Sequence, residues 1–177
     1  DEDISPTFAG GGTVEYVSRT DQRYEKDLEA RETPGTPGIL QFIKASLAYQ
    51  LRNEIGFDWI SQNKEILTKR LIDGLKEIPE CKVYGNDNEP NIGIVSFNIG
   101  ELDPYTLCQD LSESFGMQTR AGCSCAGPYG HDLLGLQDQI ALGERPGWVR
   151  ISIHYSQTQE EIDLLLASLK TAILKSR

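Results

Sequence analysis

The sequence predicts an α+β fold: a small, mostly antiparallel sheet covered by helices, preceded by an N-terminal arm and a linking helix. Three observations support this prediction. Two long segments repeat apolar residues at helical spacing, several short segments alternate apolar and polar residues, and a capped amphipathic helix ends the chain. Because short strands and single helices follow one another without a strict strand–helix–strand alternation, we expect two layers.

The chain is predicted to divide after residue 38. Residues 1–38 contain a glycine triplet, charged clusters and the prolines Pro34 and Pro37, with one strand-like piece at 13–18, so they are expected to form an arm. Residues 39–177 are expected to form a C-terminal small domain that includes the linking helix.

Two amphipathic helices are predicted to open this domain. The first runs from residue 39 to Gly56, because its apolar residues recur every four positions and glycine commonly follows a helix end. The second covers 58–76, with Asp58 as its N-cap. The residues of the second helix predicted to face the core are Ile60, Leu67, Leu71 and Leu75.

The middle of the chain is predicted to contain short strands, a turn and one helix. Asp103 and Pro104 mark the start of that helix, because aspartate is a common N-cap and proline suits the first helical position. The predicted order is strand, turn-rich segment, strand, helix and strand, at residues 82–84, 85–91, 92–99, 103–116 and 117–120.

The last third of the chain is predicted to hold a long excursion, a strand and a helix. Residues 127–147 contain several glycines and two prolines, which indicates an excursion with one helical turn. In 148–154 the apolar residues alternate, so one strand face belongs to the core and Arg150 lies on the other. A capping box starts the final helix at Thr158 and Glu161. Its predicted core residues are Ile162, Leu165, Leu166, Leu169 and Ile173.

The composition restricts the classes of partner. The 177 residues carry a formal net charge of −10, which would repel nucleic acid and anionic membranes, so a small metabolite or a protein is the expected partner. Four cysteines in a chain of this length do not make a disulfide scaffold, and no apolar run is long enough to span a bilayer. These features indicate a reducing cytosol.

The beginning of the chain is informative as well. It opens with DEDISPTFAGGGT, and its one methionine is Met117. We therefore expect the chain to be a piece of a longer protein, entered in the middle of an ordered region.

The segment RAGCSCAGPYGH, residues 120–131, contains the main candidate for chemistry. Cysteine attacks as the thiolate, and the guanidinium of Arg120 together with exposed backbone N–H groups lowers the cost of forming that anion. Cys125 is thus a candidate nucleophile on a loop. The alternative from the local sequence is that Cys123 and Cys125 are small, half-buried residues at a strand end.

Two further residues are candidates for binding anions. The guanidinium of Arg150 can bind a carboxylate through two parallel hydrogen bonds, or form a surface salt bridge. Thr36 precedes a helix expected to start at Pro37, where a phosphate would fit, although an ordinary helix cap has the same appearance. His154 shares the face of Arg150, and a lone histidine on such a strand is more often structural than catalytic. His131 is either a loop contact or a metal ligand.

Three motifs occur in a fixed order and together carry a family resemblance. They are GGGTV at 10–14, RETPGTPGI at 31–39, and RAGCSCAGP at 120–128 followed by GWVRISIHYSQTQEEID at 147–163. The sequence resembles the C-terminal part of class V aminotransferases of the pyridoxal-phosphate fold type I superfamily, in the branch of cysteine desulfurases and selenocysteine lyases. The resemblance implies the small domain of such an enzyme, with residues 1–38 as the arm from the end of its large cofactor domain.

The resemblance also implies roles for the candidate residues. Thr36 would contact the cofactor phosphate of the neighbouring subunit, which implies a homodimer, and Arg150 would bind the carboxylate of the amino-acid substrate. Cys125 would attack the sulfur of a cysteine bound to pyridoxal phosphate, which gives alanine and an enzyme persulfide. Arg120 would favour the thiolate and border the substrate pocket. A sulfur-acceptor protein is an implied partner.

The chain departs from the family pattern in three places. None of its eight lysines lies in the Ser-x-His-Lys context of the Schiff-base lysine, so the chain alone is expected to be inactive. Cys123 stands where a histidine is common, and it either resolves a persulfide or only fills space. The loop between Cys125 and Arg150 is longer than in typical desulfurases, so we expect either substrate access or the sulfur acceptor to differ from theirs.

Two other functions are consistent with the sequence. The parent enzyme could be a pyridoxal-phosphate-dependent transaminase or lyase in which Cys125 has no role as nucleophile. The chain could also be a non-enzymatic metal-binding or scaffold domain that uses Cys123, Cys125 and His131, but this spacing lacks the paired Cys-x-x-Cys frame of structural zinc. We therefore predict no metal site.

Overall fold

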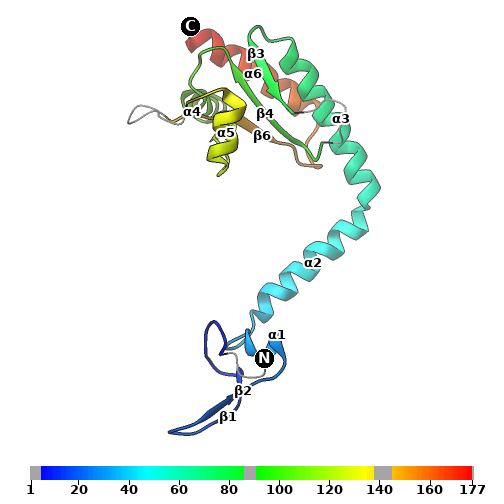
Figure 1. Cartoon of the computed structure of the whole chain (residues 1–177). Helices are drawn as coiled ribbons and strands as arrows, with labels where there is room; N and C mark the ends of the chain where they lie inside the picture. The colour runs from blue at the N-terminus through cyan, green and yellow to red at the C-terminus, as the bar shows by residue number, and fades with distance from the viewer. Residues whose placement is uncertain (1–4, 86–90, 138–144, 177) are drawn as a thin grey trace. The chain divides into compact units, whose positions relative to one another are not determined.

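The computed structural model describes residues 5–85, 91–137 and 145–176 (Figure 1). The chain forms two compact units, which span residues 1–54 and 55–177. The predicted end of the arm at residue 38 concerns the organisation of a longer protein and stays a prediction. Parts of the predicted turn at 85–91 and of the excursion at 127–147 lie outside the described residues.

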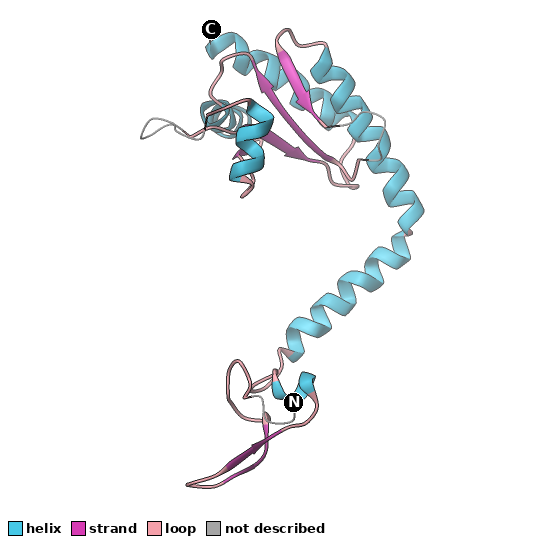
Figure 2. Cartoon of the chain, viewed as in Figure 1, coloured by secondary structure: helices cyan, strands magenta, loops and turns pink. Residues whose placement is uncertain are grey.

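The first unit contains a hairpin and two helices (Figure 2). Strands β1 (Val14–Val17) and β2 (Gln22–Tyr24) pair antiparallel, and α1 (Leu28–Arg31) and α2 (Ile39–Ile55) follow. The sequence predicted β1 and α2 but missed β2 and α1. Both missed elements are only three or four residues long, so neither contains enough residues to show a hydrophobic period.

The second unit is an antiparallel sheet of four strands with helices packed against it (Figure 1). The strand order is β3-β4-β6-β5, and every neighbouring pair is antiparallel, which confirms the predicted architecture. The strands are β3 (Cys81–Tyr84), β4 (Ile94–Ile99), β5 (Arg120–Gly122) and β6 (Trp148–Ser152). The helices are α3 (Phe57–Lys76), α4 (Pro104–Phe115), α5 (Gly127–Leu134) and α6 (Gln159–Ser176).

The core lies between one face of the sheet and α3, α4 and α6. Alternation along β4 and β6 buries Val95, Phe97, Val149 and Ile151 on this face, and the helices cover them with leucine and isoleucine. All the predicted core residues of the second and last helices are buried. The opposite sheet face carries polar side chains such as Ser96 and Arg150 beside the aromatic rings of Tyr84 and Trp148. Among the described residues, no helix is both long and apolar enough to cross a membrane.

The helix ends test the predicted caps. The carboxylate of Asp103 accepts a hydrogen bond from the Thr106 amide at 3.0 Å and caps α4 as predicted. Burial opposes ionisation of this carboxyl, but the hydrogen bonds from Thr106 outweigh it and lower its pKa. The predicted cap at Asp58 is wrong: α3 begins at Phe57, and Gly56, with φ of +94°, occupies the N-cap. Asp58 instead lies in the first turn, where a negative charge favours the helix dipole.

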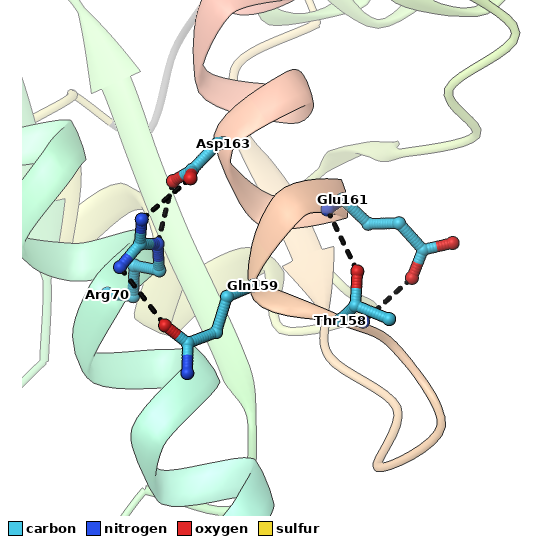
Figure 3. Close-up of polar contacts among 5 residues, drawn as sticks. All are labelled: Arg70, Thr158, Gln159, Glu161 and Asp163. Carbon is cyan, nitrogen blue, oxygen red and sulfur yellow. Dashed lines mark hydrogen bonds and ion pairs between the residues drawn. The ribbon is translucent and has the colours of Figure 1, made fainter.

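The predicted capping box of α6 is present (Figure 3). The Glu161 amide donates to Thr158 Oγ1 at 3.3 Å, and the Thr158 amide donates to Glu161 Oε2 at 2.8 Å. One turn further on, Arg70 of α3 makes two parallel hydrogen bonds to Asp163 of α6, at 2.7 and 2.6 Å. These bonds join the two long helices at their solvent side and lower the pKa of the Asp163 carboxyl.

Several other elements differ in their bounds from the prediction, and three of them have an informative cause or size. Strand β5 begins at Arg120 instead of residue 117, because the Met117 amide donates to Leu111 O at 3.0 Å and still belongs to the end of α4. Strand β4 begins at Ile94, because the Asn91 side chain accepts from the amide of Gly93 at 2.7 Å and forms a turn. Helix α5 has eight residues where one turn was predicted.

Gly147 lies where the backbones of β5 and β6 make a close approach. A Cβ atom added there would lie 2.8 Å from the carbonyl carbon and 2.9 Å from the nitrogen of Gly122. We expect Gly147→Ala to lower the free energy of unfolding by about 1–3 kcal/mol, because a backbone cannot move aside as a side chain can. Urea unfolding measures this. Gly127→Ala is the control, since a Cβ at Gly127 meets nothing within 4 Å, and equal losses in both variants would contradict the prediction.

Candidate functional site

The structure brings two of the predicted site residues together on the polar face of the sheet. Arg120 of β5 is the register partner of Arg150 of β6, and Ser96 of β4 is the partner of Arg150 on its other side. Directly opposed residues of an antiparallel pair point to the same face. Two arginines in this position repel each other, so the pair favours an anion between or above the guanidinium groups.

Arg150 has the features of a binding residue. The side chain is half-buried, and among the described residues its Nε atom is buried without a hydrogen-bond partner. A buried donor without an acceptor costs about 1–3 kcal/mol, and a ligand that accepts a hydrogen bond from this atom would remove that cost. Arg120 is exposed, which places it nearer to the edge of the site.

Cys125 lies in a tight turn that follows β5. The Ala126 amide donates to the carbonyl of Cys123 at 2.9 Å, and the two residues between them have positive φ, +53° at Ser124 and +63° at Cys125. This is the pattern of a type I′ turn, which normally contains glycine, asparagine or aspartate. The turn leaves the side chain of Cys125 exposed. Non-glycine residues in this region are strained, and such strain is common at functional sites.

The strain in this turn can be measured by substitution. We expect Ser124→Gly to raise the free energy of unfolding by about 1 kcal/mol, because glycine adopts positive φ without a steric penalty. Ser124→Ala removes the same hydroxyl but keeps the strained backbone, so this control should show no gain. Urea unfolding of both variants checks the prediction, and equal stability of the two would show that the backbone carries no strain.

The other cysteines are less suited to act as nucleophiles. Burial raises the pKa of the Cys81 thiol to about 11 and also raises the pKa of Cys108. Both thiols pack against the core and therefore remain protonated at neutral pH. Cys123 is half-buried, which leaves Cys125 as the exposed thiol of the four free cysteines.

Thr36 lies in the first unit, next to a turn made by the glycine triplet. The Thr13 hydroxyl, fully buried, donates to the carbonyl of Gly10 at 2.8 Å, and the Gly35 amide donates to the carbonyl of Gly11 at 2.7 Å. The two motifs GGGTV and RETPGTPGI therefore form one structural unit. The predicted cap is wrong, however, because α2 begins at Ile39 and not at Pro37. Thr36 is exposed in the loop before the helix, and its predicted phosphate contact stays a prediction.

The two histidines lie outside this arrangement. His154 is exposed, and its Nδ1 atom is 2.8 Å from the hydroxyl of Ser156, in agreement with a structural role. His131 is half-buried in the last turn of α5. In the part of the chain that the structure describes, no three histidine, cysteine or acidic residues are grouped so that they could hold a metal ion.

Asn98 is a polar residue of this face that no motif in the sequence indicates. Its Nδ2 atom donates to the carbonyl of Gly147 at 3.0 Å, and its Oδ1 atom is buried without a partner among the described residues. Alternation along β4 places Asn98 on the same face as Ser96, and this is the signal that could have found it. Trp148, on this face too, is 5% exposed, because α5 and the ring of Tyr84 lie against it.

Fold and site together define an α+β domain that presents an exposed thiol near a pair of arginines. The apo structure of a cysteine desulfurase from Thermococcus onnurineus NA1 has this fold, with a TM-score of 0.81 and 29% identity, over 97% of this chain and 40% of that one. The profile of the class-V aminotransferase family matches residues 1–165. The chain belongs to this family.

Two further similarities agree with this assignment. A probable cysteine desulfurase from Methanothermobacter thermautotrophicus is 35% identical over 95% of this chain, which corresponds to 40% of that protein. A solved structure of a C-DES mutant with glycine covalently linked to its pyridoxal-phosphate cofactor has the same fold, with a TM-score of 0.63 and 24% identity over 94% of this chain and 38% of that one. The chain thus spans about 40% of the length of these relatives.

Proposed function

We propose that this chain is the C-terminal portion of a pyridoxal-phosphate-dependent cysteine desulfurase. The observation that carries the proposal is the exposed, strained turn with Cys125, placed directly after the strand in which Arg120 opposes Arg150. The similarity to cysteine desulfurases along nearly the whole chain supports it. The proposed substrate is cysteine or selenocysteine.

In this proposal, each residue of the site has a separate task. Arg150 binds the substrate carboxylate through its guanidinium, and Arg120 adds positive charge beside it. The thiolate of Cys125 attacks the substrate sulfur, so that an S–S bond forms and the C–S bond breaks. The electron pair of the C–S bond stays with the carbon, which takes a proton and becomes alanine. The products are therefore alanine and a persulfide on Cys125.

The cofactor needs residues from more than this chain. Thr36 is exposed beside the glycine turn and can donate its hydroxyl to a phosphate, which fits one end of pyridoxal phosphate. None of the lysines has the Ser-x-His-Lys context, so we propose that the remaining contacts come from a preceding large domain and from a second subunit of a homodimer. When bound, pyridoxal phosphate supplies an electron sink for the charge left on the substrate carbon.

We further propose a protein partner and a cellular compartment for the enzyme. A sulfur-acceptor protein would take the terminal sulfur from the exposed Cys125. Four free cysteines in the described structure are compatible with a reducing cytosol, which we propose as the compartment.

The proposal is tested by the reaction of the longer protein. We expect the protein extended to include the cofactor domain to convert L-cysteine, in the presence of a reductant, to alanine and sulfide in equal amounts. The 177-residue chain alone should produce neither. Transfer of the amino group to a keto acid without sulfide would overturn the proposal and identify a transaminase.

A further inference from the structure

Cys123, at the first position of the turn, makes a specific hydrogen bond through its thiol. Its Sγ atom lies 3.1 Å from the carbonyl oxygen of Pro146. A carbonyl oxygen can only accept, so the thiol is the donor in this bond. Pro146 lies two residues before β6, the strand that contains Arg150.

Helix α5 packs against one side of this thiol. A Cβ atom added to Gly130 of α5 would lie 2.9 Å from Cys123 Sγ and 3.4 Å from the ring of Trp148. The absence of a side chain at Gly130 therefore lets α5 approach the sulfur closely.

The segment bound by Cys123 is itself held in place. Gly147 follows Pro146, and its carbonyl accepts a hydrogen bond from Asn98 Nδ2 at 3.0 Å. The backbone of Gly147 also packs against that of Gly122, at the end of β5. The Pro146 carbonyl thus binds the cysteine turn, and the Gly147 carbonyl binds Asn98 of β4. Both bonds are made by the two residues that immediately precede β6.

We propose that Cys123 is a positioning residue, whose S–H bond to the Pro146 carbonyl holds the turn 123–126 at the start of β6 and so fixes Cys125 relative to Arg150. Cys123 is not expected to resolve a persulfide in this arrangement, because its S–H is engaged with the Pro146 carbonyl and Gly130 of α5 packs beside its sulfur. The inference deepens the proposed function, since the fixed spacing matters to a thiol that attacks a substrate bound at Arg150. The geometry itself can be tested without turnover.

Two variants of the chain separate positioning from reactivity. Cys123→Ala removes the donor, and Cys123→Ser keeps a donor of similar size. Because the Ala126 amide bonds to the carbonyl of Cys123, its hydrogen exchange reports on the turn. We expect exchange at Ala126 to be about five-fold faster in Cys123→Ala and close to the parent rate in Cys123→Ser.

Two results would overturn the inference. One is an Ala126 exchange rate in Cys123→Ser as high as that in Cys123→Ala. The other is a disulfide between Cys123 and Cys125 that forms on treatment with diamide, a thiol oxidant, as fast as iodoacetamide alkylates Cys125, as measured by peptide mass spectrometry. In the longer protein we expect Cys123→Ala to lower kcat about five-fold and leave KM for cysteine unchanged, because Arg150 stays in place. Absence of sulfide formation in every variant, with exchange rescued by serine, would refute the desulfurase proposal and retain the positioning role.

Discussion

Replacement of Cys125 by serine is expected to abolish sulfide formation from cysteine in the longer protein, with a fall in kcat of about a thousand-fold or more. A serine hydroxyl is a much weaker acid and a poorer nucleophile toward sulfur than a cysteine thiol, so it cannot take over the attack. The substitution changes one atom in an exposed side chain, so folding and substrate affinity should be retained. Sulfide and alanine are measured together in one assay.

The matched control for this variant is Cys81→Ser. Burial raises the pKa of Cys81 to about 11, so this thiol is protonated and its replacement should leave sulfide formation intact. Sulfide formation that survives in Cys125→Ser and disappears in Cys81→Ser would assign the chemistry to the wrong cysteine and refute the site.

The second large effect is expected from Arg150. Arg150→Gln should lower kcat/KM for cysteine about a hundred-fold, mainly through KM, because two charge-assisted hydrogen bonds to the carboxylate are lost. Arg150→Lys retains the charge without the planar guanidinium, so its kcat/KM should lie between those of the parent and of Arg150→Gln. Initial rates over a range of cysteine concentrations give both constants.

The position of Arg150 also supplies a control for folding. Removal of its charge relieves the repulsion from Arg120, its partner across the strands, so the Gln variant should not unfold more easily than the parent. Arg120→Gln should have a smaller effect on KM, because this side chain is exposed. A KM unchanged by Arg150→Gln would exclude Arg150 as the carboxylate site.

Local signals explain the correct part of the predicted fold. Capping boxes and caps depend on residues three positions apart, and both Asp103 and the pair of Thr158 and Glu161 bond as the sequence indicates. The alternation along β6 likewise predicts which side of the strand is buried, with Val149 and Ile151 in the core. Such features need no knowledge of distant parts of the chain.

The errors at the ends of elements come from local backbone bonds, whereas the omissions in the site come from interactions between distant parts of the chain. Met117 belongs to the end of α4, because its amide reaches back to Leu111, and this contact moved the start of β5. Arg120 and Arg150 lie opposite each other because of the order of strands in the sheet, and the local sequence of the strands does not indicate that order. For the same reason, the sequence does not predict the hydrogen bond from Cys123 to Pro146 or the one from Asn98 to Gly147, which join residues far apart in the chain.

Strand β5 is short and lies at the edge of its sheet, where β6 is its one neighbouring strand among the residues that the structure describes. Its first residue, Arg120, lies opposite Arg150, so charge repulsion weakens the pairing of the strand that leads into the Cys125 turn. An anion that neutralises this repulsion would hold the border strand more firmly, and by reciprocity a firmly held strand would bind the anion more tightly. Binding of a carboxylate at the two arginines and positioning of the Cys125 turn would then be thermodynamically coupled.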